Sequence, residues 1–479
     1  MTLDATTWSE EFEADFADGG THEATVARIA AAVNDLLDED SRTRTNNLTR
    51  MDEQLLAQAK TMTVIEQEGN ARAAAGLPMW TADEEAQIRD EVIGRMFGLD
   101  KLNRHIKNPL VEDIYIDGCN PIHLRLSTGE IVEQPPVANT NEELLALLRR
   151  AAIHGTETER QMTATKPFLD LRLPEGQRGA VMWDVTPDPV VTIRCHRFID
   201  VTLDDLVEMG MVSPLMAQFL AAAVRGRRTI VVTGPQGAGK TLLLRALARA
   251  VSVNERIATL ETERELHLHH LKDPNGRKQF KLLIPIEARE GSGEIGANGR
   301  PAGEVSLADL VPASLRHSVR RLLIGEMRAE EIVPAVLAMG RGYAGTLTSF
   351  HANSAEGAFT ALASALMLYR GNIDNSAARS MVADAVDLFV HVDMEVTAAG
   401  TNRYVSDILE IGQGLTHDLR SISTTIFQPR EDLEDTDPRG YFALAPEKTL
   451  WLRRGGLSPD ELTPANDGWP QHFPPRLLA

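Results

Sequence analysis

The chain has 479 residues, enough for about three domains, and its 43% hydrophobic and 25% charged residues are ordinary for a soluble globular protein. A formal net charge of −20 argues against broad adhesion to nucleic acid or anionic lipid, so we do not expect direct nucleic-acid binding. The two cysteines, Cys119 and Cys195, are too few for a disulfide framework or a cysteine-based zinc site, which suits the cytoplasm.

Membrane signals are missing from the sequence pattern. The opening stretch MTLDATTWSEEFEADFADGG is acidic and has no apolar core, so we expect no signal peptide. No run approaches the roughly 18 apolar residues that a membrane-spanning helix needs. Any work at a membrane would therefore depend on a partner protein.

Residues 1–104 are expected to form a helical, partly flexible region. Apolar residues recur at helical spacing after Thr21, in the stretch THEATVARIAAAVNDLLDE. Thr81 is followed three residues later by Glu84, which is the pattern of a capping box at the start of another helix. The charged segment 41–60 between them gives no clear prediction.

Residues 105–205 change to the pattern of a small α+β domain. Four stretches cluster or alternate β-forming residues around Gly and Pro turns: VEDIYIDG, PIHLRLSTGEIVE, LDLRLPEGQRGAVMWDV and VVTIRCHRF. One helix is predicted among them, near 141–153.

Residues 206–428 alternate apolar, strand-like runs with helical stretches, which predicts an α/β domain with an open sheet. The predicted strands are RRTIVVTG, RIATLE, RRLLIGE, GTLTSF, DLFVHVD and YVSDILEIG. The tail 429–479 is rich in Pro, Asp and Arg, and we expect it to be peripheral or disordered.

A phosphate-binding loop is the strongest signal in the chain. TGPQGAGKT has the spacing G-x-x-x-x-G-K-T, follows a β-branched run and precedes a helix-forming stretch, as such a loop requires. Lys240 would neutralise the β and γ phosphates of ATP, and the Thr241 hydroxyl would bind Mg²⁺. The predicted nucleotide-binding residues are Gly234, Pro235, Gln236, Gly237, Ala238, Gly239, Lys240, Thr241 and Leu242.

The stretch RRLLIGEMR predicts a buried strand that ends in a carboxylate, Glu326. Beside a phosphate-binding loop, such a carboxylate can polarise the attacking water as a general base. A second strand, GTLTSF, delivers His351 at its end, where ligands bind in α/β sheets. His351 would sense the γ-phosphate or hold the water-activating group in position.

Two further carboxylates, Glu261 at the end of the stretch RIATLE and Glu265 just after it, would face the metal and γ-phosphate region. A neighbouring HLHH tract, containing His267, His269 and His270, resembles a metal-binding tract. It has no matching set of carboxylate or cysteine ligands, so we interpret it as a solvated face.

Taken together, the motifs resemble the secretion-superfamily traffic ATPases of type II and type IV secretion and type IV pili. The match is closest to the CpaF/TadA-like branch that serves tight-adherence (Tad or Flp) pili. GPQGAGKT is similar to the family's Walker A, TLETEREL to its Asp box, RRLLIGEMR to its Walker B and GTLTSFHAN to its His box. The resemblance covers about 105–415 and implies a RecA-like P-loop NTPase domain preceded by a PAS-like domain.

The resemblance also implies roles for single residues. Glu326 would be the catalytic base, Glu261 and Glu265 would line the metal and water site, with Mg²⁺ on Thr241 and Glu261, and His351 would sense the nucleotide state. The family delivers arginines from its N-terminal domain to the γ-phosphate. The candidates here are Arg172, Arg178 and Arg194, with Arg197 behind them.

Two departures from the family pattern stand out. Thr262 occupies the position where the Asp box has its Asp, which leaves the metal to Glu261, Glu265 and Thr241. The tetracysteine zinc insertion of the type II secretion and pilus-extension branch is absent, since two cysteines cannot form it.

The resemblance implies a hexameric ATPase that powers Tad-type pilus assembly or protein secretion, docked on an inner-membrane platform protein at the inner face of the cell membrane. Two alternatives stay open at this point. One is a nucleotide-binding assembly switch with little hydrolysis, which the Thr262 departure would favour. The other is a motor of a conjugation-type DNA transfer system.

Overall fold

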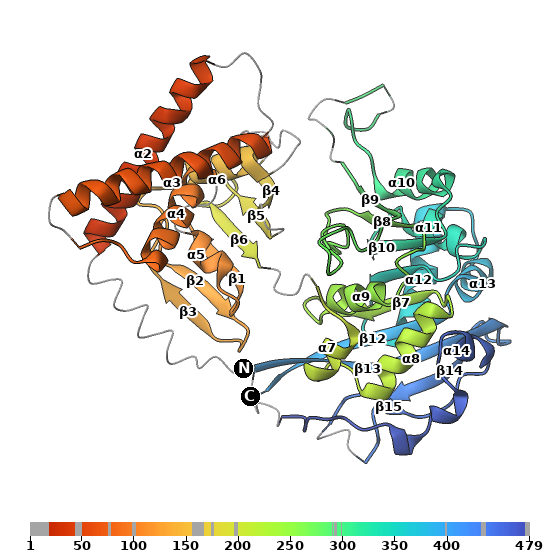
Figure 1. The fold of residues 1–479 in the computed structure, drawn as a ribbon. Coiled ribbons are helices and arrows are strands. Elements are labelled where there is room, and N and C mark those ends of the chain that lie inside the picture. The colour runs from red at the N-terminus through yellow and green to blue at the C-terminus, as the bar shows by residue number, and fades with distance from the viewer. Residues whose placement is uncertain are drawn as a thin grey trace. The chain divides into compact units, whose positions relative to one another are not determined.

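The computed structural model describes residues 19–43, 50–74, 78–97, 102–155, 167–173, 177–195, 200–289, 291, 295–297, 299–397, 400–432 and 437–474. The chain divides into two compact units, Met1–Arg197 and Phe198–Ala479 (Figure 1).

The described part of the first unit begins with the helices α2 (Gly19–Thr43), α3 (Arg50–Ala74) and α4 (Ala82–Phe97). They pack around a small apolar core of Val26, Ile29, Ala30, Val33, Val64, Ile65, Ile88 and Val92. The predicted capping box is confirmed, because Thr81 Oγ1 accepts from the Glu84 amide and the Glu84 carboxylate accepts from the Thr81 amide. Helix α3 includes part of the charged segment that gave no prediction, and only a narrow apolar stripe of it is buried.

The rest of the first unit is an antiparallel sheet in the order β3-β2-β1-β6-β5-β4. Its elements are α5 (Asn103–Lys107), β1 (Val111–Asp117), β2 (Ile122–Leu126), β3 (Ile131–Gln134), α6 (Asn141–Gly155), β4 (Phe168–Arg172), β5 (Arg178–Met182) and β6 (Val190–Arg194). Alternate strand residues such as Ile114, Ile116 and Ile193 pack with Leu144 and Leu148 of α6. The predicted strands and helix of this region are confirmed.

The second unit is a nine-stranded sheet in the order β15-β14-β13-β12-β7-β11-β10-β8-β9. From one edge, the strands β9, β8, β10, β11, β7 and β12 are parallel to one another. Strands β13, β14 and β15 continue the sheet beyond β12 with antiparallel pairing. The strands are β7 (Ile230–Gly234), β8 (Ile257–Glu261), β9 (Leu283–Glu287), β10 (Arg321–Met327), β11 (Leu347–His351), β12 (Leu388–Thr397), β13 (Gly400–Leu415), β14 (Ser421–Gln428) and β15 (Tyr441–Phe442). All six strands predicted for this sheet are present; β9, β14 and β15 were not predicted.

Helices cover both faces of this sheet, which makes the fold α/β. One core includes α7 (Leu203–Glu208), α8 (Pro214–Arg225), α9 (Lys240–Arg249) and α14 (Leu450–Arg454); the other includes α10 (Leu307–Ser314), α11 (Ile332–Met339), α12 (Ala355–Arg370) and α13 (Asn375–Ala385). Strand β7 is buried on both faces: Ile230 and Val232 enter the first core and Val231 the second. This burial explains its continuous apolar run.

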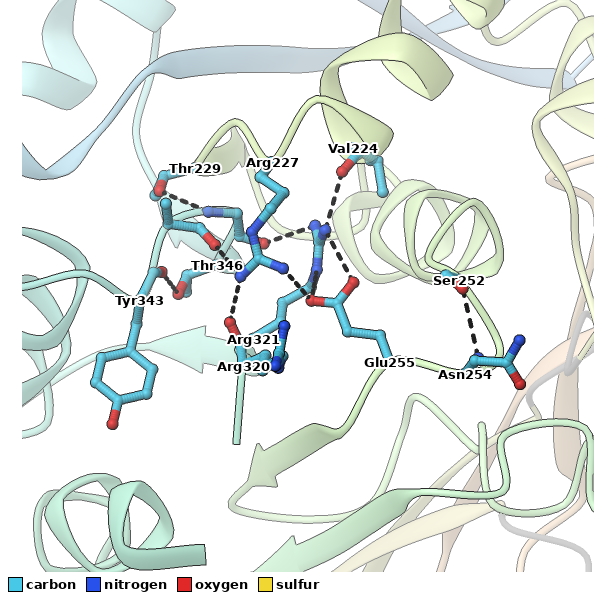
Figure 2. A network of polar contacts seen from close by, with 12 residues as sticks. Val224, Arg227, Thr229, Ser252, Asn254, Glu255, Arg320, Arg321, Tyr343 and Thr346 are labelled. Carbon is cyan, nitrogen blue, oxygen red and sulfur yellow. Dashed lines mark hydrogen bonds and ion pairs between the residues drawn. The ribbon is translucent and has the colours of Figure 1, made fainter. Parts of the chain in front are cut away.

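A buried ionic network fixes the amino ends of the parallel strands (Figure 2). Arg321, the first residue of β10, is 1% exposed and donates to Glu255 Oε1 and Oε2 at 3.2 and 3.3 Å. It also donates to the carbonyl oxygens of Gly345 and Val224 at 2.9 and 3.0 Å. Arg227 donates to Glu255 at 2.7 Å from the other side. These hydrogen bonds join the C-terminal end of α8 to the N-terminal ends of β8, β10 and β11.

The expectation that the tail would be peripheral or disordered is wrong for residues 437–474. Trp451, Leu452, Leu457 and Leu462 are buried in the main core, and Trp451 lies edge-on to Phe219 with ring centroids 5.5 Å apart. These few large apolar residues are spaced among Pro and polar residues, so the average composition concealed them. A tail of polar composition can still be anchored by a small number of buried side chains.

Candidate active site

The phosphate-binding loop leaves β7 at Gly234 and enters α9 at Lys240. Gly234, Gly237 and Gly239 have φ values of 147°, 82° and 97°, which non-glycine residues rarely adopt. A Cβ on Gly234 would also lie 2.1 Å from the carbonyl oxygen of Val392 on β12. The glycines therefore permit both the curvature of the loop and the close approach of its neighbouring strand. The predicted strand–loop–helix unit is present.

The Lys240 ammonium group has three hydrogen-bond acceptors around it. Its Nζ lies 3.1 Å from Gly234 O, 2.8 Å from Pro235 O and 3.2 Å from His351 Nδ1. An ammonium has three protons, so these contacts use its full donor capacity. Burial lowers the pKa of Lys240, while Glu326 acts in the opposite sense. These three contacts fix the Lys240 ammonium group inside the phosphate-binding loop.

His351 connects Lys240 to Glu326. It ends β11 directly opposite Gly234 in the parallel register, which places its ring beside the loop. Its Nε2 lies 2.7 Å from Glu326 Oε1. This distance is that of an ion-pair contact, and the geometry does not make it a hydrogen bond, since Glu326 Oε1 is a buried oxygen without a hydrogen-bond donor among the described residues. The two histidine nitrogens thus link the phosphate loop to the predicted base.

A local irregularity in β10 directs Glu326 toward this ring. The pairing of β10 with β11 shifts between Ile324 and Met327, so two residues, Gly325 and Glu326, face Ser349 alone. Such a bulge changes the direction in which a side chain points. Ser349 Oγ donates to Gly325 O at 2.7 Å and fixes the bulge. Gly325 and Glu326 of RRLLIGEMR therefore form the bulge, and Glu326 also supplies the carboxylate beside His351.

Arg328 holds the other oxygen of Glu326. Its Nε donates to Glu326 Oε2 at 2.7 Å and its Nη2 contacts the same oxygen. The carboxylate is thus engaged by His351 on Oε1 and by Arg328 on Oε2. The sequence prediction named Glu326 and His351 but missed Arg328; its position two residues after Glu326, on the far side of the bulge, was the available signal.

Glu261, the last residue of β8, and Glu265, four residues later, have different surroundings. Glu261 is 2% exposed, and its Oε1 accepts from the amides of Glu265 and Leu266 at 2.8 and 2.7 Å. Glu265 Oε2 accepts from Thr241 Oγ1 at 3.3 Å. Glu261 therefore shapes the turn, and Glu265 is the carboxylate that the structure places beside the predicted Mg²⁺ hydroxyl. Thr262, at the departure from the family pattern, is exposed.

The donor set around Thr241 fits Mg²⁺. A hydroxyl and a carboxylate are hard oxygen ligands, and Mg²⁺ in nucleotide enzymes takes one or two protein oxygens and completes its shell with phosphates and water. Within the described ranges no group of three His, Cys, Asp or Glu residues can hold a metal by itself. His267, His269 and His270 lie with ring centroids 4.0 to 6.3 Å apart, and they form no such group.

The candidate arginines of the first unit fall in one row. Arg172 on β4 lies opposite Arg178 on β5, and Arg178 lies opposite Arg194 on β6. Arg194 in turn lies opposite Asp113, whose buried carboxylate is 3.3 Å from the Arg194 Nε. Directly opposed residues share one face of a sheet. Arg197 lies outside the described residues.

A profile of the family described as "Type II/IV secretion system protein" matches residues 98–387, more than half of the chain. The chain belongs to this family. Family members hydrolyse ATP, so this secretion-type traffic ATPase is an enzyme.

Known relatives agree with this assignment. The type IV secretion system protein VirB11 of Brucella suis is 27% identical over 342 residues, covering 65% of this chain and 89% of VirB11. A Mycobacterium tuberculosis protein provisionally named for conjugal transfer is 33% identical over 241 residues, 49% of this chain and 63% of that protein.

Two solved ATPase structures align with this chain over most of their own length. The VirB11 ATPase of B. suis, crystallised with sulphate, gives a TM-score of 0.33 at 24% identity, covering 65% of this chain and 95% of that one. The pilus retraction motor PilT with bound ADP gives 0.44 at 15% identity, covering 66% and 83%. Searched over its described residues, the secretion ATPase has no helix with the length and apolar character that crossing a bilayer requires.

Proposed function

We propose that this ATPase is the motor of a Tad-type pilus assembly or protein secretion system. It would work as a cytoplasmic hexameric ring docked on a platform protein of the inner membrane. Its second unit would be the RecA-like motor domain and the sheet of its first unit the PAS-like domain. The observation that carries the proposal is the chain of contacts Lys240–His351–Glu326, which links phosphate binding to a catalytic carboxylate.

ATP binding would change the contacts of Lys240. The ammonium has no spare proton for a phosphate oxygen, so contact with the triphosphate requires it to give up an acceptor. The two loop carbonyls lie in its own loop, whereas His351 lies on another strand and is the acceptor most readily lost. His351 would then lose its contact with Lys240 and would contact the γ-phosphate instead. Its contact with Glu326 would therefore differ between nucleotide states.

Glu326 would take the proton of the attacking water once its oxygens are released. A positioned general base of this kind contributes roughly 10²–10⁴ in rate. Thr241 and Glu265 would hold Mg²⁺, with Glu261 supporting their turn; the ion would supply positive charge against the phosphate oxygens. By the family resemblance, Arg172, Arg178 and Arg194, which are opposed in register on β4, β5 and β6, would bring positive charge to the γ-phosphate.

The Tad assignment rests on the motif resemblance and on cysteine content. The chain has two cysteines, one exposed and one buried, and so lacks the four-cysteine zinc insertion of the other pilus branch. The relative named for conjugal transfer supports a second candidate, a motor within a DNA transfer system. Direct contact with DNA is not part of that proposal, given the net charge of −20.

Gene deletion in the host, with complementation, distinguishes these functions. Loss of surface pili or of secreted protein is expected, with rescue by the wild-type chain and not by Glu326→Gln. Asp418→Asn, a change at an exposed residue in the turn between β13 and β14, is the matched control and should rescue fully. Loss of conjugation with normal pili and secretion would contradict the Tad assignment and support the second candidate.

A further inference from the structure

The hairpin β12–β13 lies beside the phosphate loop and beyond the stretch that matches the family, which ends at residue 387. Strand β12 pairs directly with β7, and the carbonyl oxygen of Val392 approaches Gly234. Met394 on β12 and Arg403 on β13 are opposite each other in register. The hairpin therefore lies directly against the phosphate-binding loop.

Arg403 makes direct contact with the loop. Its Nε donates to Gly237 O at 2.9 Å. Its Cδ would lie 3.4 Å from a Cβ placed on Gly239, so the side chain extends along the loop from one glycine to the other. The guanidinium group is an ionised donor, and such hydrogen bonds are among the stronger ones.

This bond controls the direction of a loop amide. The peptide unit is planar and trans, so its C=O and the following N–H point in opposite directions. With Gly237 O held by Arg403, the N–H of Ala238 is directed to the inner side of the loop, where it makes a long 3.4 Å contact with Pro235 O. A phosphate oxygen can replace that weak contact, because loops of this kind bind phosphate through converging N–H groups.

The segment that carries Arg403 is itself anchored. The amide of Val405 donates to Met211 O at 2.9 Å, and Val405 O accepts from Gly440 at 3.0 Å. The ring of Tyr404 meets Phe473 of the tail edge-on, with centroids 5.3 Å apart. Arg403 therefore acts from a fixed strand rather than from a loop.

We propose that Arg403 is a positioning residue for ATP binding: it holds the phosphate loop in the conformation that receives the triphosphate and adds positive charge beside it. The proposal rests on the ATPase activity assigned to this site. It deepens that activity by giving the β12–β13 hairpin, and through it the tail, a part in nucleotide affinity.

The test is steady-state ATPase kinetics with Mg²⁺, together with equilibrium binding of ADP, on the full chain. Arg403→Gln should raise KM for ATP and Kd for ADP about tenfold, as expected for the loss of one charged hydrogen bond, with kcat changed less than about threefold. Arg403→Lys should recover most of the affinity, since it keeps a charged donor. Arg420→Gln, at an exposed arginine in the turn between β13 and β14, is the matched control and should behave as wild type.

Unchanged KM and Kd in Arg403→Gln would overturn the proposal, as would a fall in kcat with KM unchanged. If Arg403→Gln does not fold, Arg403→Met keeps the apolar stem without the donor and is judged by the same criteria. Absence of ATPase activity in the wild type would instead be a failure of the enzymatic assignment, so the two failures are distinguishable.

Discussion

The ring of His351 is joined to the carboxylate of Glu326 by a 2.7 Å contact between Nε2 and Oε1, although the two residues end different strands. Its other nitrogen lies 3.2 Å from Lys240 Nζ. The imidazole therefore lies between a cation and a carboxylate, with one ring nitrogen close to each.

Replacing His351 tests this link. His351→Gln should lower kcat roughly 10- to 100-fold, because Glu326 loses the group that orients it, while the Kd for ATP stays within about threefold. Stopped-flow binding and steady-state turnover give the two quantities. His417→Gln, at a fully exposed histidine, is the control. An equal loss of binding and turnover would contradict a role for His351 in linking them.

Glu265 sets the metal dependence in this account. Glu265→Gln keeps the shape of the side chain and removes its charge, so the Mg²⁺ concentration for half-maximal turnover should rise about tenfold. Glu263→Gln changes a neighbouring carboxylate on the same turn and serves as the control. A Mg²⁺ titration in which the two variants coincide would show that Glu265 does not hold the ion.

The Arg321 network makes a prediction about stability rather than chemistry. Arg321→Met should lower the free energy of unfolding by about 1–3 kcal/mol, because Glu255 would keep only Arg227 and the carbonyl oxygens of Gly345 and Val224 would lose their donor. Denaturant unfolding of the second unit measures this loss. Arg320→Met alters the exposed neighbouring arginine and should change stability by no more than about 0.5 kcal/mol. Similar losses in both variants would contradict the network's role.

His105 gives the first unit a pH dependence. Burial lowers the pKa of this histidine to about 4, with a smaller contribution from Arg104, against an ordinary value of 6.5. Between these values the unfolded chain binds a proton that the folded chain does not, so stability is complete above pH 6.5 and is lost as the pH falls toward 4. The loss between pH 7.5 and 5 should be about 2 kcal/mol. His105→Gln should remove it, and an unchanged pH profile in that variant would contradict the assignment.

Much of the fold could be predicted because its signals are local. The Gly-rich loop, the β-branched run before it and the helix after it determine the strand–loop–helix unit, and parallel strands place their carboxyl ends at one edge. This is why Glu326 and His351, each at the end of a predicted strand, could be expected near Lys240.

The remaining features depend on contacts between distant residues. The bulge at Gly325 and Glu326 follows from the pairing of β10 with β11, which the sequence of either strand alone does not reveal. Arg403 reaches the loop only because β12 and β13 fold back beside β7. The tail looked peripheral by composition, yet Trp451 and three leucines decide its position by burial. Glu261 was expected to bind Mg²⁺, because the sequence does not show that the amides of Glu265 and Leu266 donate to its carboxylate.

The most direct test of the central claim is the Mg²⁺-dependent ATPase rate of the wild type and Glu326→Gln, measured with ATP binding and with particle size in ATP. The account predicts that the wild type turns over, and that Glu326→Gln binds ATP and forms the same ring but hydrolyses at least about 100-fold more slowly. Equal turnover in the two proteins would show that Glu326 is not the base.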